Sequence, residues 1–178
     1  MTALSTVLDG ERVPPDLPER SATAAAEIVA DDAALAVSGF GSVGYPKATP
    51  EALAAAADDR SLSLTVVSGG STGPPIDTTL VETGAVARRF PYQATPEARR
   101  AANELTMGFA DRGIAGLSDE VRFGRLVDPD VAVVEAVAVG DGWLAPSTSV
   151  GQTPAYVRAA DELIVEVNAA QPRALARF

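Results

Sequence analysis

The sequence has 178 residues and 47% hydrophobic content, enough for one domain with a core. It carries 24 Asp and Glu against 14 Lys and Arg, a net charge of −10, and Lys47 is its only lysine. This balance excludes a nucleic-acid-binding surface, because phosphates would be repelled and no basic stripe is present. An acidic, lysine-poor surface is typical of proteins that stay hydrated in molar salt. We therefore expect a salt-adapted protein, with an ordinary acidic protein as the alternative.

The sequence contains no cysteine and no histidine. Disulfides, zinc–thiolate sites, cysteine nucleophiles and Ser-His-Asp triads are therefore excluded, and we expect no metal site. Acid–base or nucleophilic roles must come from carboxylates, Lys47, tyrosines or hydroxyls. The first 20 residues lack a basic segment followed by an apolar run, and no apolar run approaches the ~18 residues of a membrane span. These features predict a cytoplasmic protein that binds no membrane.

Residues 1–20, which include three prolines, are predicted to form an extended arm before a domain over 21–178. Strands and helices then alternate along the chain. The expected elements are a helix over 21–30 capped by Ser21, a strand over 33–37, a helix over 49–58 capped by Thr49, a strand over 62–67, a helix that Asp77 could cap, helices that start at Thr95 and Ser118, a strand over 131–139, a helix that starts at Thr153 and a strand over 163–167. This alternation predicts an α/β fold with a mostly parallel sheet and flanking helices.

Glycine-rich turns follow the first two predicted strands, and we call residues 39–44 the first glycine turn and residues 69–73 the second. In parallel sheets ligands bind at the carboxyl ends of strands, where both turns fall. The first turn also matches G-x-G-x-x-G, which suggests dinucleotide binding. Against that, its last glycine leads into Tyr45-Pro46-Lys47 rather than a helix, and Ser68 stands where an acidic residue would bind a ribose.

Six blocks in order, from Gly39 to Asn168, resemble the acetyl-CoA hydrolase/transferase family. The blocks are Ser38-Gly39-Phe40-Gly41-Ser42-Val43-Gly44-Tyr45-Pro46-Lys47, Ser68-Gly69-Gly70-Ser71-Thr72-Gly73 with Asp77 to Leu80, Arg88-Arg89-Phe90-Pro91-Tyr92-Gln93, Asp130 to Ala136, Asp141-Gly142-Trp143 with Ser147 to Gly151, and Ala160-Asp161 through Asn168. One departure is that Gly116-Leu117-Ser118 stands where the family usually has D-x-H-L-S, so a histidine is absent.

The resemblance implies a CoA-transferase-like α/β half and an enzyme that moves coenzyme A between short-chain carboxylic acids, with coenzyme A as a substrate rather than a resident cofactor. Family members have two related halves. Their catalytic glutamate, which forms a glutamyl-CoA intermediate, lies in the second half, so the resemblance implies no catalytic residue in this chain. The expected partners are an acyl-CoA, a carboxylate and a carboxyl-terminal half or second chain. A non-catalytic acyl-CoA-binding remnant and a dinucleotide-binding domain stay as alternatives.

Glycine turns at strand ends let backbone N–H groups approach a substrate oxyanion closely. On the resemblance, the turns and the lysine after them would bind the acyl group, the acceptor carboxylate or coenzyme A, although glycines also serve plain turns. The predicted substrate-binding residues are Gly39, Gly41, Ser42, Gly44, Lys47, Gly69, Gly70, Ser71 and Thr72.

Charged residues inside the predicted strands are expected to be paired, because a buried charge needs a partner. Glu135 and Glu166 interrupt apolar strands, and Arg88 and Arg89 are expected to pair with carboxylates such as Glu135, or alternatively to bind phosphates. The two apolar strands that contain these glutamates are expected to expose an inter-half face. The chain is therefore predicted to form a homo-oligomer.

Overall fold

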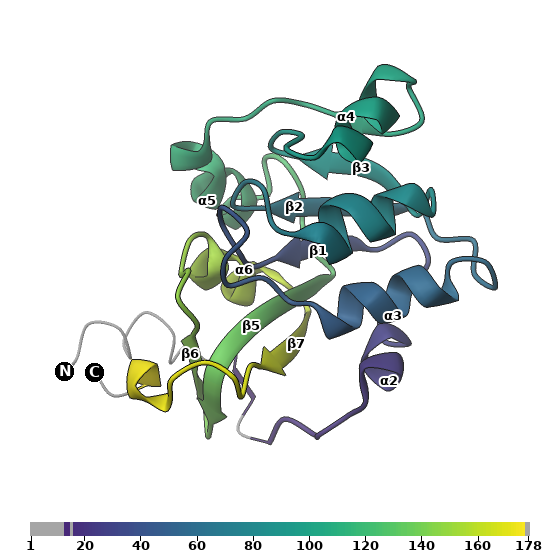
Figure 1. Cartoon of the computed structure of the whole chain (residues 1–178). Coiled ribbons are helices and arrows are strands. Elements are labelled where there is room, and N and C mark those ends of the chain that lie inside the picture. The colour runs from purple at the N-terminus through teal and green to yellow at the C-terminus, as the bar shows by residue number, and fades with distance from the viewer. Residues whose placement is uncertain (1–12, 15, 177–178) are drawn as a thin grey trace.

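A sheet of seven strands crosses the part of the chain that the structure, a computed structural model, describes, namely residues 13–14 and 16–176 (Figure 1). The strands are β1 (Ala34–Val37), β2 (Leu64–Ser68), β3 (Val86–Phe90), β4 (Gly108–Phe109), β5 (Val131–Gly140), β6 (Trp143–Pro146) and β7 (Glu162–Val167). Their order is β4-β3-β2-β1-β5-β6, and β7 pairs with β5. All pairings are parallel except the β5–β6 hairpin, so the predicted α/β fold with a mostly parallel sheet is confirmed.

Helices cover both faces of the sheet (Figure 1). They are α2 (Ala22–Ala26), α3 (Ala48–Ala56), the π-helix η1 (Pro75–Leu80), α4 (Pro96–Asn103), α5 (Ile114–Arg122), α6 (Thr153–Ala159) and the 3-10 helix η2 (Arg173–Ala176). The helices α2, α3, η1 and α4 pack on the face that holds Leu35, Val66 and Val133. The helices α5 and α6 pack on the opposite face, which holds Ala36, Val67 and Val134. Successive strand residues point to opposite faces, so one buried strand contributes to both cores.

Three helix starts differ from the sequence-based expectation. Helix α3 begins at Ala48 rather than after Thr49, and Asp77 lies inside η1 instead of capping it. Helix α5 begins at Ile114, before the predicted start at Ser118. In contrast, Ser21 and Thr95 cap α2 and α4 as predicted, each accepting a hydrogen bond from a backbone N–H three residues later.

Strands β3, β4 and β6 are not among the elements that the sequence pattern predicts. Strand β3 carries two arginines, β4 has only two residues, and β6 follows the Asp141-Gly142 turn with only four. Such short or polar segments form strands because their neighbours in the sheet pair with them, and their own pattern does not show it. The buried strand β5 covers the predicted 131–139 segment and ends one residue later.

Part of the predicted amino-terminal arm, residues 1–12 and 15, lies outside the described residues. Residues 16–20 of that arm have no regular secondary structure. No helix among residues 13–14 and 16–176 is long and apolar enough to cross a membrane.

Candidate functional site

The two glycine turns lie side by side at the carboxyl end of the sheet. Strands β1 and β2 are parallel neighbours, and Val37 pairs with Ser68 immediately before the turns begin. The Ser42 N–H donates to the carbonyl of Ser71 across 3.5 Å, which links the two turns directly. The structure therefore brings together two segments that are about thirty residues apart in the sequence, as the strand pattern predicts.

Steric contact explains why several turn positions are glycine. A Cβ on Gly69 would lie 2.9 Å from the Gly39 carbonyl oxygen, and a Cβ on Gly73 would overlap the ring of Tyr45. Gly39 and Gly44 also have φ of 118° and 66°, values that side chains disfavour. Gly69 thus packs against the backbone of Gly39 and Gly73 against the ring of Tyr45, so a side chain at either position would clash.

The predicted substrate-binding residues divide into buried and accessible groups. Gly41 and Ser42 are exposed and Ser71 is half-buried, whereas the remaining turn members, Gly39, Gly44, Gly69, Gly70 and Thr72, are buried. The N–H groups of Gly41 and Ser71 donate to no atom of the described residues. Gly41 and Ser42 both have positive φ near 60°, and the Gly41 N–H stays available to an anion, whereas the Ser42 N–H already donates to Ser71.

A buried ion pair supports the second glycine turn. The guanidinium of Arg89, which is fully buried, donates to Asp77 Oδ1 from Nε at 2.9 Å and from Nη2 at 2.7 Å. Arg89 also donates to Ser68 Oγ and to the Gly70 carbonyl, while Asp77 Oδ2 accepts from the N–H and the hydroxyl of Thr72. Thr72 is thus held by Asp77, and its hydroxyl and N–H are already used.

The expected pairing of Arg89 with a carboxylate is confirmed, but its partner is Asp77 and not Glu135. The sequence alone suggests a helix cap for Asp77, because a helix is expected to follow the second glycine turn. The sequence supplies only the expectation that a buried arginine needs a carboxylate partner, and its pattern does not show that Arg89 lies in a strand. Nothing in the sequence pattern indicates which carboxylate reaches it.

Lys47, which follows the first glycine turn, binds Glu135. Its Nζ donates to Glu135 Oε2 and, at 2.8 Å, to the carbonyl of Tyr45, and it lies 4.2 Å from the centre of the Tyr45 ring. The lysine side chain is 45% exposed while that of Glu135 is 3% exposed. The pair therefore runs from the interior to the surface, and one of the three lysine N–H groups has no partner among the described residues.

Glu166 caps helix α3 from strand β7. Its carboxylate accepts hydrogen bonds from the backbone N–H groups of Lys47, Ala48 and Thr49 at 2.6, 3.0 and 2.6 Å. These are the unpaired N–H groups of the first helical turn, which prefer a negative charge. In a dinucleotide-binding domain the pyrophosphate would need the same groups, so the chain's own carboxylate occupies that position.

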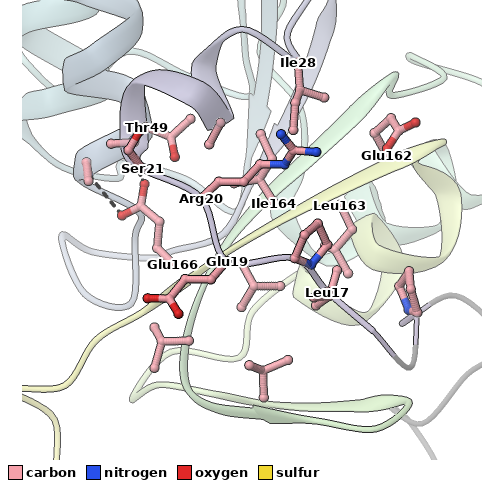
Figure 2. Close-up of a pocket in the computed structure, with 18 of the residues that line it drawn as sticks. Leu17, Glu19, Arg20, Ser21, Ile28, Thr49, Glu162, Leu163, Ile164 and Glu166 are labelled. Carbon is pink, nitrogen blue, oxygen red and sulfur yellow. Dashed lines mark hydrogen bonds between the residues drawn. The ribbon is translucent and has the colours of Figure 1, made fainter.

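A groove of about 960 Å³ runs along β7, between the strand and residues 14 and 16–22 (Figure 2). Figure 2 shows Glu19, Arg20, Glu162 and Glu166 around it, with Leu163 and Ile164 in its wall. No residue of either glycine turn lines the groove. Its charged lining is mostly acidic, which disfavours a phosphate-bearing ligand such as coenzyme A.

Solved structures of two other proteins share this fold. The chain resembles RipA from Yersinia pestis with a TM-score of 0.69 at 18% sequence identity, over 86% of this chain and 37% of that one. It also resembles a variant of the decarboxylase AibA/AibB with a TM-score of 0.56 at 20% identity, over 86% of this chain and 78% of that one. At these identities the likeness shows the fold alone.

Sequence comparison gives the family. The acetyl-CoA hydrolase/transferase N-terminal domain matches residues 18–176, and the chain belongs to this family. It is 35% identical over 155 residues to succinyl-CoA:acetate CoA-transferase of Clostridium kluyveri, covering 85% of this chain and 29% of the relative. It is 32% identical over 154 residues to propanoyl-CoA:succinate CoA transferase of Escherichia coli, covering 83% and 31%. An acetyl-CoA hydrolase of Yarrowia lipolytica is 30% identical over 148 residues, covering 76% and 28%. The chain thus spans about three tenths of the length of these relatives.

Proposed function

We propose that this chain supplies the amino-terminal domain of an enzyme that exchanges coenzyme A between short-chain carboxylic acids, or hydrolyses acetyl-CoA. The main structural support is that the two glycine turns meet at the carboxyl end of neighbouring parallel strands. In these turns the N–H groups of Gly41 and Ser71 have no hydrogen-bond acceptor among the described residues. The support from similarity is that the relatives named above are CoA-transferases and a hydrolase.

In this proposal a glutamate outside the chain attacks the acyl-CoA thioester carbonyl and expels coenzyme A. The thiolate then attacks the glutamyl carbonyl of the resulting anhydride, releases the first acid as its carboxylate and forms a glutamyl-CoA thioester. The acceptor carboxylate displaces the thiolate from this thioester, and the thiolate attacks the acceptor carbonyl of the new anhydride, which frees the glutamate; alternatively, water hydrolyses the thioester to glutamate and coenzyme A. Each attack develops negative charge on a carbonyl oxygen. The amides of the two turns would donate to that oxygen or to the acceptor carboxylate.

The nine predicted residues take different parts in this proposal. Gly41, Ser42 and Ser71 are accessible and would contact substrate, and the third N–H of Lys47 would donate to a substrate carboxylate or a coenzyme A phosphate. The buried members would support the backbone of the turns; they are Gly39, Gly44, Gly69, Gly70 and Thr72.

Neither strand glutamate of this chain suits the nucleophile. Glu135 is 3% exposed and bound to Lys47 and Asn168 through Oε2. Both carboxylate oxygens of Glu166 accept backbone N–H groups of α3. A nucleophilic carboxylate must reach the thioester carbonyl, so the proposal places the nucleophile in a carboxyl-terminal half or partner chain.

We propose that this other half covers the surface around the turns and that the assembly is a homo-oligomer. Phe40, Val43 and Val150 are 48%, 43% and 39% exposed. The expected inter-half face on β5 is wrong, because residues 131–137 of that strand are buried within the chain itself.

The test is release of thiol from acetyl-CoA by the purified chain, with and without succinate or acetate. We expect no turnover by the chain alone and turnover when a second chain that carries the family's glutamate is added. Turnover by the chain alone would place the nucleophile among its own carboxylates and contradict the proposal. Binding of acetyl-CoA without any restored turnover would favour the non-catalytic remnant.

A matched pair of variants tests the proposed contact. Lys47→Met removes the half-exposed ammonium, and Arg125→Met removes an exposed cation that packs on Phe123. Both change the net charge by one. Calorimetric titration with coenzyme A is expected to show weaker binding only for Lys47→Met. An equal loss of affinity in both variants would show that Lys47 acts only through the overall charge of the protein.

A further inference from the structure

Glu135 is a carboxylate in the middle of an otherwise apolar buried strand. Its Oε2 accepts from Lys47 Nζ and, at 3.1 Å, from Asn168 Nδ2, whereas Oε1 has no hydrogen-bond partner among the described residues. Burying an ionised group costs free energy unless other charges and donors compensate. The side chains that compensate the buried charge of Glu135 are therefore those of Lys47 and Asn168.

Glu135 contacts the first glycine turn at two points. Its side chain holds Lys47, which follows the turn, and its backbone N–H donates to Ser38 Oγ at 2.8 Å. The Ser38 hydroxyl donates in turn to the carbonyl of Gly44, also at 2.8 Å. One residue of β5 thus connects to both the beginning and the end of the turn.

The contact continues into the second glycine turn. Lys47 Nζ binds the Tyr45 carbonyl and lies over the Tyr45 ring, and that ring lies against Gly73 so closely that no side chain fits there. The path from Glu135 therefore passes through Lys47 and Tyr45 to the second turn.

We propose that Glu135 is a positioning residue for the substrate-binding turns. By holding Lys47 and, through Ser38, the Gly44 carbonyl, it fixes the first turn in the shape that presents its amides and the last lysine N–H to an anionic substrate group. This inference rests on the proposed function, because positioning matters only if the turns bind substrate. The contacts of Glu135 with Lys47 and Ser38, however, exist in the chain without ligand.

Because Lys47 is the only lysine, its reactivity reports directly on its interaction with Glu135. The chain is treated with a small amount of acetic anhydride, and mass spectrometry compares acetylation of Lys47 with that of the amino-terminal amine. The charge-assisted hydrogen bond to Glu135 must break before Nζ can attack the anhydride, and the loss of such a bond changes an equilibrium by about tenfold. Glu135→Gln is expected to raise the ratio about tenfold, and Glu162→Gln, an exposed change of equal charge on β7, is expected to leave it unchanged.

A second measurement tests whether Glu135 stabilises the conformation of the first glycine turn or affects only the Lys47 side chain. Amide hydrogen exchange of the peptide over 38–47 is expected to lose protection in Glu135→Gln, while a peptide over 114–122 in α5 keeps its protection. Unfolding midpoints check that the variant is folded. Should Glu135→Gln not fold, Glu135→Asp keeps the charge, withdraws it by one methylene, and is expected to move both readouts in the same direction.

Adding coenzyme A or succinate tests whether the interaction between Glu135 and Lys47 matters for ligand binding. In the wild-type chain each is expected to protect Lys47 from acetylation, and in Glu135→Gln this protection is expected to be lost. An unchanged acetylation ratio and unchanged exchange, or retained protection in Glu135→Gln, would overturn the positioning role. Absence of protection in the wild-type chain would contradict the proposed function instead, because the ratio and the exchange need no ligand.

Discussion

Two glycines of the first turn carry unequal constraints, although both have positive φ. Gly39 has φ 118°, and a Cβ there would lie 2.7 Å from the Tyr45 Cβ; Gly41 has φ 60° with no atom within 4 Å of its Cβ position. Gly41→Ala is expected to lower the free energy of unfolding by about 1 kcal/mol, from backbone strain alone. Gly39→Ala is expected to cost about 3 kcal/mol, because overlap adds to strain.

Urea unfolding of both variants and the wild type measures these losses. The two variants are matched, since each adds one methyl group to the same turn. Equal losses would contradict the close packing of Gly39 against Tyr45.

Tyr156 buries a hydroxyl that has no hydrogen-bond partner among the described residues, and its side chain is fully buried. An unpaired buried hydroxyl lowers stability, and removing it can be neutral or favourable. Tyr156→Phe is therefore expected to leave the free energy of unfolding unchanged or to raise it by up to about 1 kcal/mol in urea unfolding at pH 7. A loss of more than that amount would show that the hydroxyl is paired.

The same residue predicts a pH dependence. Burial raises the pKa of Tyr156 above its ordinary value of 10.0, although the nearby Arg89 charge partly offsets this. A raised pKa in the folded state means that the stability contribution is present below the ordinary value and is lost as the pH rises above it. The fall in unfolding free energy above about pH 10 is expected to be shallower in Tyr156→Phe, and an identical slope would contradict it.

At the scale of elements, α3 and α4 begin in different ways. Helix α4 is capped by the neighbouring Thr95 in the sequence, whereas α3 is capped by Glu166 from β7, 117 residues beyond Thr49. The α3 cap therefore exists only when the helix and the strand have packed together.

The remote cap makes a quantitative prediction. Glu166→Ala removes three charge-assisted hydrogen bonds at the start of α3 and is expected to lower the free energy of unfolding by about 2 kcal/mol. Thr95→Ala, the matched control on α4, is expected to cost about 1 kcal/mol. Chemical denaturation compares them, and a smaller loss for Glu166→Ala would contradict its role as a cap.

At the scale of the whole molecule, we propose salt adaptation from the net charge of −10 and the single lysine. Mutual repulsion of surface carboxylates is screened as the Debye length falls from about 10 Å at 0.1 M to about 3 Å at 1 M salt. The thermal midpoint is expected to rise between about 0.1 M and about 2 M KCl. A variant with Lys at the exposed positions Asp32, Asp59 and Asp141 is expected to show a smaller rise. An equal rise in both would contradict charge screening as the cause.

Much of the fold could be predicted from local pattern. Apolar runs such as 131–139 predict their strands, and Ser21 and Thr95 predict helix starts, because both signals act over a few residues. The predicted start of α3 is misplaced for the opposite reason, since its cap comes from β7. Strand β3 is not predicted because its two arginines interrupt the apolar pattern of a strand, although it pairs with β2 in the sheet.

The sequence by itself determined the α/β class, the positions of the two glycine turns and the family resemblance, because alternating apolar segments and ordered motifs are local properties of the chain. Only the tertiary structure decided the partners of the buried charges: Asp77 for Arg89, Lys47 for Glu135 and the start of α3 for Glu166. Each of these contacts joins residues from different elements. Burial shows that such a charge must be compensated, but the packing of the sheet and its helices selects the group that compensates it.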